Sequence, residues 1–171
     1  MKASRSWWGV LLILVMMSGL TACSAPELTL EERADALRKA VADYKTWTQH
    51  PDHKGVQKSK DGTHGKSVQV WVNSVAAGVI GKFDKEFPNG TIIVKRGYDS
   101  DDDSKPRAFI TVMQKIKGFD PDNGDWFTAS IPDDSAKAVS MYTDDKRKSG
   151  CMGCHSAGKD SSDYILFVKK F

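Results

Sequence analysis

The stretch Cys151-Met152-Gly153-Cys154-His155 holds two thiols and an imidazole close together near the end of the chain. Two cysteines at this spacing can capture the vinyl groups of a haem as thioethers, and a histidine that follows directly can bind the iron. The pattern therefore predicts one covalently attached haem c, with Cys151 and Cys154 as the attachment points and His155 as the proximal iron ligand.

Other chemistries use the same residue types. A disulfide between Cys151 and Cys154 would close a very short, strained loop and would leave His155 without a role. A zinc site could draw on His50 and His53, but their H-x-x-H spacing is tighter than that of common zinc sites. Zinc and an incidental or redox-active cysteine pair remain the alternatives, and haem attachment is the favoured interpretation.

The sixth coordination position of such an iron decides between electron transfer and ligand binding. Sixteen residues follow His155, and none of them is Met, His or Cys. A sixth protein ligand would therefore come from upstream, where the candidates are Met113, Met141, His50, His53 and His64. The other outcome is an open position for a small ligand.

The N-terminus has the composition of a bacterial signal peptide. Lys2 and Arg5 precede a short apolar run, residues 10–17, which is much shorter than the roughly 20 residues that span a bilayer. Leu20-Thr21-Ala22-Cys23 resembles a lipoprotein cleavage site, so we expect Cys23 to be lipidated. Ordinary cleavage nearby, with Cys23 unmodified, is the alternative.

These assignments divide the chain into a signal peptide (1–22), a tether (23–28) and one haem domain (29–171). Export agrees with haem attachment to cysteines, so we expect a periplasmic protein anchored by lipid to a bacterial membrane, with the outer membrane as the expected one. Removal of residues 1–22, which carry two basic and no acidic side chains, lowers the formal net charge from +3 to +1. This near-neutral charge argues against a nucleic-acid partner.

An amphipathic helix is expected at the start of the mature domain. Thr29 and Glu32 have the spacing of a capping box. They are accompanied by apolar residues at helical spacing: Leu30, Ala34, Leu37, Val41 and Tyr44. We expect this helix to end near residues 47–49 and residues 50–65 to form a loop.

Further along the chain, the apolar period changes to the alternation of β-strands. Strands are expected within residues 67–73, 87–95, 108–115, 126–131 and 164–168, and a short helical piece within 134–144. Turns rather than long helices join the strands, which favours an antiparallel sheet. The prediction is an α+β fold: mainly antiparallel β-sheet with an N-terminal amphipathic helix, short C-terminal helical segments and haem packed against the sheet.

Two aspartate-rich stretches, residues 99–103 and 120–125, begin like calcium-binding loops. Ser104 and Ile110 stand where the first loop would need glycine and glutamate, and Ile131 stands at the last position of the second. We therefore interpret both stretches as solvated turns.

Taken in order, several motifs resemble the cytochrome P-460 family of β-rich haem proteins. They are His64-Gly65 leading into VQVWVN, FPNGTIIVK, MQK followed by DPDNGDW at 120–126, CMGCH, and Asp163-Tyr164. The resemblance runs from about Tyr44 to Phe167. That family includes hydroxylamine oxidisers and the related cytochromes c′-beta.

The resemblance gives Lys95 a role that the residue pattern alone does not. In the enzymatic members a lysine at the end of the FPNGTIIVK-like strand is cross-linked to the haem, which implies that Lys95 is a catalytic and haem-binding residue. Both faces of its strand are partly apolar, so alternation does not place this side chain, and most lysines lie in solvent. The chain departs from many relatives at Arg96, where they carry an acid, and at about Val68, where some hydroxylamine oxidisers carry arginine.

The implied function is oxidation of hydroxylamine or a related small nitrogen compound at an open haem iron, with electrons passing to an external redox partner protein. The alternatives are a nitric oxide-binding protein without turnover, similar to the cytochromes c′-beta, and a simple electron carrier. The sequence thus leaves open whether the protein is an oxidoreductase acting on hydroxylamine or nitric oxide. Relatives form homodimers, so the resemblance also implies a homodimer.

Overall fold

The structure is a computed structural model that describes residues 27–51, 54–60, 62–80, 86–134, 136–142 and 150–166. The predicted signal peptide, Cys23, most of the predicted tether and His53 lie outside these residues. Within the described part of the chain, no helix is both long enough and apolar enough to cross a membrane.

Helix α1 (Leu30–Ala40) begins with the expected capping box. The Thr29 hydroxyl accepts a hydrogen bond from Glu32 N at 3.2 Å, and the Glu32 carboxylate accepts one from Thr29 N at 2.9 Å. The helix ends earlier than predicted, and a separate turn of 3-10 helix, η1 (Tyr44–Thr46), follows. The apolar spacing continues past the end of α1 because Val41 and Tyr44 enter the same core from this irregular segment.

Seven strands form one sheet: β1 (Thr48–Gln49), β2 (Gln57–Lys58), β3 (Ser67–Val72), β4 (Ile92–Tyr98), β5 (Pro106–Lys115), β6 (Trp126–Pro132) and β7 (Val139–Ser140). The strand order is β1-β3-β4-β5-β6-β7, and β2 also pairs with β3. All pairings are antiparallel. The predicted α+β class with a mainly antiparallel sheet is confirmed.

Short helical segments account for most of the remaining regular structure. They are α2 (Ser74–Ala77), η3 (Pro121–Asn123), α3 (Gly150–His155), η4 (Ser156–Gly158) and α4 (Lys159–Ser162). The helical piece expected within 134–144 is wrong for its described part, because Val139 and Ser140 pair with β6 as β7. The strand expected at 164–168 is wrong where the structure describes it, because Tyr164 has a left-handed φ of 67° that a strand excludes.

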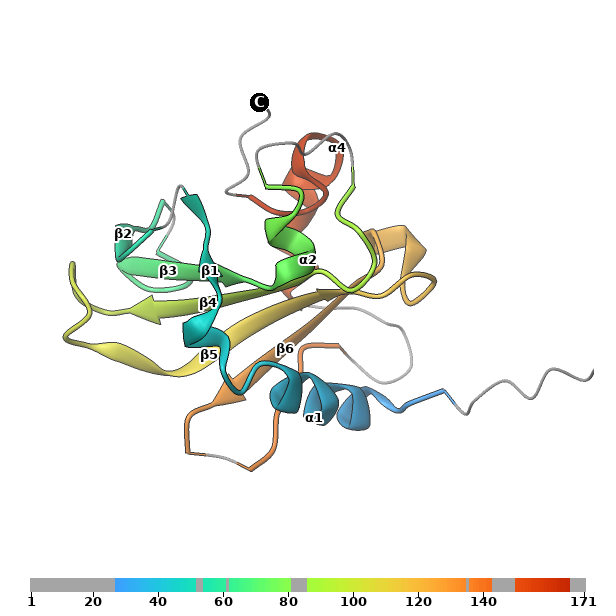
Figure 1. The fold of residues 1–171 in the computed structure, drawn as a ribbon, viewed down its shortest axis with the longest axis horizontal. Helices are drawn as coiled ribbons and strands as arrows, with labels where there is room; N and C mark the ends of the chain where they lie inside the picture. Colours follow the sequence, from blue (N-terminus) through green and yellow to red (C-terminus); the bar gives the residue numbers. More distant parts are fainter. Residues whose placement is uncertain are drawn as a thin grey trace, which may run out of the picture.

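Helical segments lie on both faces of the sheet (Figure 1). Helix α1 covers one face, whose core includes Leu37, Trp71, Val94, Val112 and Phe127. The other face carries a second cluster under α2, α3 and the last described residues, with Val70, Val72, Ile93, Trp126, Met152 and Ile165. Alternation along each strand explains the division, since neighbouring residues such as Ile93 and Val94 belong to opposite faces.

The two aspartate-rich stretches differ from each other. Residues Asp101–Asp103 are exposed, as a solvated turn requires. In the second stretch Asp120 is only 6% exposed, and Gly124, with φ of 65°, lies directly against the Tyr164 ring. A Cβ at Gly124 would lie within 2.4 Å of that ring, so the second stretch is a packed turn rather than a solvated one. The described residues include no cluster of three His, Cys, Asp or Glu side chains suited to a metal ion.

Candidate functional site

The CMGCH motif forms the helix α3, which explains its spacing. Residues three and four apart lie on one face of a helix, so Cys151, Cys154 and His155 share a face. Cys151 is half-buried, Cys154 is exposed, and the two are not joined by a disulfide. His155 is only 6% exposed. The helix therefore presents two thiols and one buried imidazole in the same direction.

One nitrogen of the buried imidazole has a backbone partner. His155 Nδ1 lies 2.7 Å from the carbonyl oxygen of Tyr164. Because a carbonyl only accepts, this contact requires the proton on Nδ1 and makes Nε2 the nitrogen suited to bind iron. A histidine that ligates a metal ordinarily has such a partner on its other nitrogen.

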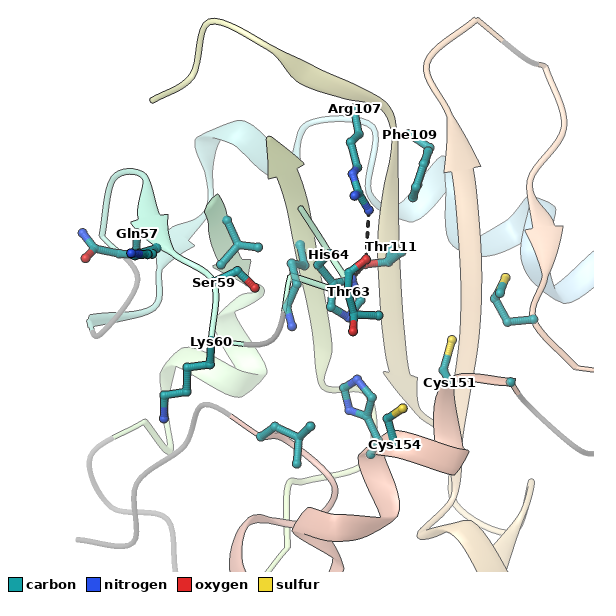
Figure 2. Close-up of a pocket in the computed structure, with 17 residues that line it drawn as sticks. Gln57, Ser59, Lys60, Thr63, His64, Arg107, Phe109, Thr111, Cys151 and Cys154 are labelled. Carbon is teal, nitrogen blue, oxygen red and sulfur yellow. Dashed lines mark hydrogen bonds between the residues drawn. The ribbon is translucent and has the colours of Figure 1, made fainter. Parts of the chain in front are cut away.

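Next to α3 the structure forms a cavity of about 790 Å³, within the size range of cofactor sites. Figure 2 shows Cys151 and Cys154 on one side of it, with His64 and Thr111 across the cavity and Gln57, Ser59 and Lys60 along another side. Strand residues Val68, Lys95, Phe109 and Thr111 form the sheet wall. The cavity lies on the sheet face that is opposite α1.

Lys95 projects into this cavity. In the sheet Lys95 pairs with Val70 on β3 and with Thr111 on β5, and it shares its face with Ile93. The side chain is half-buried and lines the cavity together with both cysteines and His155. The structure thus brings Lys95, Cys151, Cys154 and His155 to one place, although alternation in the sequence did not decide which face Lys95 occupies.

His64 lies across the cavity from His155. The centres of the two rings are 6.3 Å apart and their planes are inclined by 83°. His64 Nδ1 lies 3.5 Å from the Thr111 hydroxyl, a long contact for a hydrogen bond. The sequence analysis quoted His64-Gly65 among the motifs of the family resemblance, but as an iron ligand His64 was one of five candidates, because nothing in its spacing relates it to a motif about ninety residues downstream.

The segment that carries His64 is held tightly against β4 and β5. A Cβ on Gly97 would lie 1.7 Å from the His64 carbonyl oxygen, and a Cβ on Gly65 would lie 2.4 Å from the Tyr98 carbonyl oxygen. Arg107 donates a hydrogen bond to the Thr63 carbonyl at 2.9 Å, which is the dashed line in Figure 2. Two glycines at points of close backbone approach and one arginine therefore fix the position of His64.

The other candidates for a sixth ligand differ in position. Met141 lines the cavity. Met113 packs against the second core cluster and borders a smaller pocket that shares His64, Lys95 and His155 with the cavity. His50 is 3% exposed and is not among the residues that line either pocket. Of the three candidate histidines, only His53 falls outside the described residues, and His64 is the one at the cavity.

Among the described residues that line the cavity, four are cationic and none is a carboxylate: Lys58, Lys60, Lys95 and Arg107. The remaining wall is largely apolar. A haem has an apolar ring and two carboxylate propionates, so an apolar cavity with cations and no acids fits it. The thiols and the imidazole on α3 supply the donor set that covalent attachment and iron ligation need.

A buried ion pair lies behind His155. Lys115 Nζ donates to both oxygens of Asp163 at 2.8 and 2.7 Å, and both residues are nearly inaccessible. Burial raises the pKa of Asp163, and the Lys115 ammonium and the Phe87 N–H act in the opposite direction. Both charges belong to motifs of the family resemblance, MQK and Asp163-Tyr164, but no role was predicted for either. The two residues are 48 positions apart, and no local pattern relates them.

The departures noted at Val68 and Arg96 have different positions in the structure. Val68 lines the cavity, where an arginine would add a further cation. Arg96 is on the opposite face of β4, where it binds both oxygens of Asp133 at 2.7 Å and the Tyr44 hydroxyl at 3.1 Å. Arg96 is therefore a residue of the α1-side core and not of the cavity.

Comparison with known proteins agrees with this arrangement. No curated protein matches the chain. The sequence matches the family Cytochrome P460 over residues 41–167, a span that contains all seven strands, the residues that line the cavity and the CMGCH helix, but not helix α1. The family implies a haem cofactor, which the cavity and its donor groups fit. The chain belongs to the cytochrome P460 family.

Proposed function

We propose that this cytochrome oxidises hydroxylamine or a related small nitrogen compound at a single, covalently bound haem c. The observation that carries the proposal is that Lys95 lines the same cavity as Cys151, Cys154 and His155. A lysine at this position accompanies the hydroxylamine-oxidising members of the family that the sequence resembles.

In this proposal the residues of α3 and β4 hold the cofactor. Cys151 and Cys154 bind it through thioethers, His155 Nε2 binds its iron, and Lys95 is cross-linked to the ring and alters its electronic properties. The cationic side chains at the cavity wall are suited to the propionates. The haem supplies the chemistry of ligand binding and electron uptake.

The residues across the cavity contact the substrate. His64 lies opposite His155, and Thr111 lies beside His64. An imidazole and a hydroxyl can orient a small polar molecule such as hydroxylamine, while Val68 and Phe109 exclude water around it. Two hydroxylamine molecules yield nitrous oxide and water with release of four protons and four electrons. One hydroxylamine and one water yield nitrous acid with the same release.

These electrons require an external acceptor, so the proposal includes a redox partner protein. The N-terminal sequence supports a location for this exchange: export to the periplasm, with lipid on Cys23 as the membrane anchor. A homodimer remains part of the proposal from resemblance alone.

Nitric oxide binding without turnover is the second candidate. It is favoured by the apolar part of the cavity wall, which includes Val68, Phe109, Met141 and Leu166. An apolar wall suits an uncharged diatomic gas better than a polar substrate. The electron-carrier alternative is favoured by the position of His64, since a second imidazole on the iron would close it to small ligands.

The deciding experiment uses full-length protein made in cells that attach haem c. The ferric absorption spectrum is recorded with and without hydroxylamine, in the presence of an artificial electron acceptor. A strongly red-shifted main band, together with hydroxylamine-dependent reduction of the acceptor, supports the proposal. An ordinary c-type spectrum with nitric oxide binding but no reduction supports the gas-binding alternative. A low-spin spectrum insensitive to both ligands supports the electron carrier.

A further inference from the structure

We propose that the buried ion pair of Lys115 and Asp163 positions the carbonyl group that holds His155, and through it sets the reduction potential of the haem iron. The inference rests on the assignment of His155 as the iron ligand. It gives a role to two charged side chains that do not line the cavity and that the proposed reaction does not use.

The Tyr164 carbonyl accepts the hydrogen bond from His155 Nδ1 at 2.7 Å. A strong acceptor at this nitrogen makes the imidazole a more basic ligand, which stabilises ferric iron relative to ferrous iron. The direction of the carbonyl therefore matters as much as its presence, because hydrogen bonds weaken as their geometry departs from linear.

The backbone that carries this carbonyl is not in a relaxed conformation. Asp163 has φ of 48° and Tyr164 has φ of 67°, so two consecutive residues with side chains occupy the left-handed region. Such residues persist only where surrounding contacts hold them. Without those contacts, the Tyr164 carbonyl would lose the direction that it has toward His155.

The contacts converge on Asp163 from three other parts of the chain. Its carboxylate binds Lys115 Nζ at 2.8 and 2.7 Å and accepts from Phe87 N at 2.8 Å. Its carbonyl oxygen accepts from Trp126 Nε1 at 2.8 Å. Lys115 ends β5 and Trp126 begins β6, so the sheet itself fixes the turn at Asp163.

Tyr164 is also held by its own side chain and backbone. Its ring lies on Gly124, its hydroxyl donates to the Asp122 carbonyl at 3.1 Å, and its N–H donates to Gly158 O at 3.2 Å. Three segments of the chain thus come into contact behind His155: the DPDNGDW turn, the MQK end of β5 and Asp163-Tyr164.

Stability alone does not account for the ion pair. Removing two charges from water costs free energy that their attraction repays only with good geometry, and apolar replacements often stabilise a protein as well or better. A pair that orients a ligand, by contrast, needs the directional bonds that a carboxylate and an ammonium provide.

The test is the double variant Lys115→Met/Asp163→Asn, which removes the pair without changing the net charge. The haem-loaded protein is measured by redox titration and by resonance Raman spectroscopy of the ferrous form. We expect a higher reduction potential and a lower iron–histidine stretching frequency, with the haem still covalently attached. A haem-loaded double variant with both values unchanged overturns the proposal, and so does a change in the opposite direction.

The matched control is Arg96→Met/Asp133→Asn on the other face of the sheet, which also removes an ion pair whose arginine is buried. This control should lower the free energy of unfolding, but Arg96 and Asp133 do not contact His155 or Tyr164. The reduction potential of its haem and the iron–histidine stretching frequency are therefore expected to stay at the wild-type values. Equal shifts in the two double variants overturn the proposal, because they indicate general loosening of the fold.

If the double variant does not fold, Trp126→Phe removes the donor to the Asp163 carbonyl, together with part of a buried ring that also lies against Lys115, and is expected to shift both values in the same direction by less. Unchanged values in a folded Trp126→Phe protein contradict the proposal. The reduction potential and the stretching frequency do not depend on turnover. If the wild-type protein does not oxidise hydroxylamine, the proposed function is refuted but this inference is not.

Discussion

The rings of His64 and His155 lie 6.3 Å apart, with one on the loop before β3 and the other on α3. Metal–imidazole bonds of about 2 Å place the two rings of a ligand pair at a similar separation. At this separation His64 would lie within reach of an iron bound to His155, and it would contact a small molecule on that iron only if the two rings were farther apart. The choice between these two roles separates the candidate functions.

The first prediction concerns His64. His64→Leu keeps a side chain of similar bulk and removes the hydrogen-bonding groups. If His64 orients the substrate, the dissociation constant for hydroxylamine rises by about 2- to 12-fold, the equivalent of one net hydrogen bond of about 0.5–1.5 kcal/mol. Spectral titration of the ferric protein with hydroxylamine measures this dissociation constant.

Phe109→Leu is the control for His64→Leu, since it changes an apolar residue of the same cavity wall and leaves the hydrogen bond. Binding of hydroxylamine that is unchanged or tighter in His64→Leu contradicts the orienting role. Conversion of a low-spin wild-type spectrum to a high-spin one would identify His64 as the sixth ligand instead.

The second prediction concerns Lys95. Tryptic digestion of the mature protein should give a haem-containing peptide that joins β4 to the CMGCH helix, because Lys95 and the two cysteines line one cavity. Lys95→Arg keeps the positive charge and cannot form the same bond. Its spectrum should be that of an ordinary c-type haem, and hydroxylamine oxidation should be lost.

Lys58→Arg is the matched control for Lys95→Arg, because Lys58 lines the same cavity as an exposed residue on β2. Its spectrum and mass map should equal those of the wild type. Detection of an unmodified Lys95 peptide from fully matured wild-type protein would rule out the cross-link.

The sequence predicted the sheet well because alternation and turns are local signals. Strands β3, β5 and β6 lie within two residues of their predicted bounds, and the capping box of α1 is where it was predicted, although the helix ends earlier than expected. The incorrect secondary-structure predictions occur where tertiary contacts determine the backbone conformation. Residues 164–166 have the apolar composition of a strand, but Tyr164 takes a left-handed conformation because Gly124 and Asp122 hold its side chain.

The relative placement of the candidate site residues was predictable where they belong to one motif. Cys151, Cys154 and His155 share one helix face for the reason that their spacing gives. The partners of this motif come from other parts of the chain, since His64 and Lys115 reach the site only through strand register and close backbone contacts. A single sequence contains no signal for such pairings.

The third prediction concerns the backbone contact that fixes His64. Gly97→Ala would place a Cβ 1.7 Å from the His64 carbonyl oxygen, so the loop must move away from β4. Overpacking of this kind costs about 1–3 kcal/mol or more in the free energy of unfolding. Urea unfolding of the haem-loaded protein measures the loss, and hydroxylamine binding should weaken in parallel.

Gly78→Ala provides the control for Gly97→Ala. Gly78 has right-handed backbone angles, and its nearest neighbour to an added Cβ is at an ordinary 3.5 Å. The free energy of unfolding should be equal to or slightly above that of the wild type. A Gly97→Ala protein as stable as Gly78→Ala would contradict the close approach between β4 and the His64 segment.

The fourth prediction concerns the two thiols. Cys151→Ala/Cys154→Ala removes the attachment points and leaves His155 in place. The proposed Lys95 cross-link would then be the remaining covalent bond to the haem, so the haem should still stay with the chain on a denaturing gel after treatment with acid and organic solvent. Lys95→Arg added to the two changes should release it. Haem extracted from the double variant that keeps Lys95 would contradict the cross-link, and haem that resists extraction from the triple variant would contradict attachment through the two thiols.

The last prediction concerns Cys23, which lies outside the described residues. If Cys23 carries lipid, the wild-type protein fractionates with membranes, because stable anchoring needs more buried hydrocarbon than one acyl chain provides and bacterial lipoproteins carry several. Cys23→Ala removes the acceptor thiol and should leave the protein either soluble in the periplasm or held as an unprocessed precursor. Ser24→Ala changes the adjacent residue and should leave membrane fractionation intact. The lipid anchor would be contradicted if the wild-type protein were soluble after cell fractionation and its mass showed an unmodified Cys23. This outcome would not affect the haem site, since the residues that line the cavity all follow the tether.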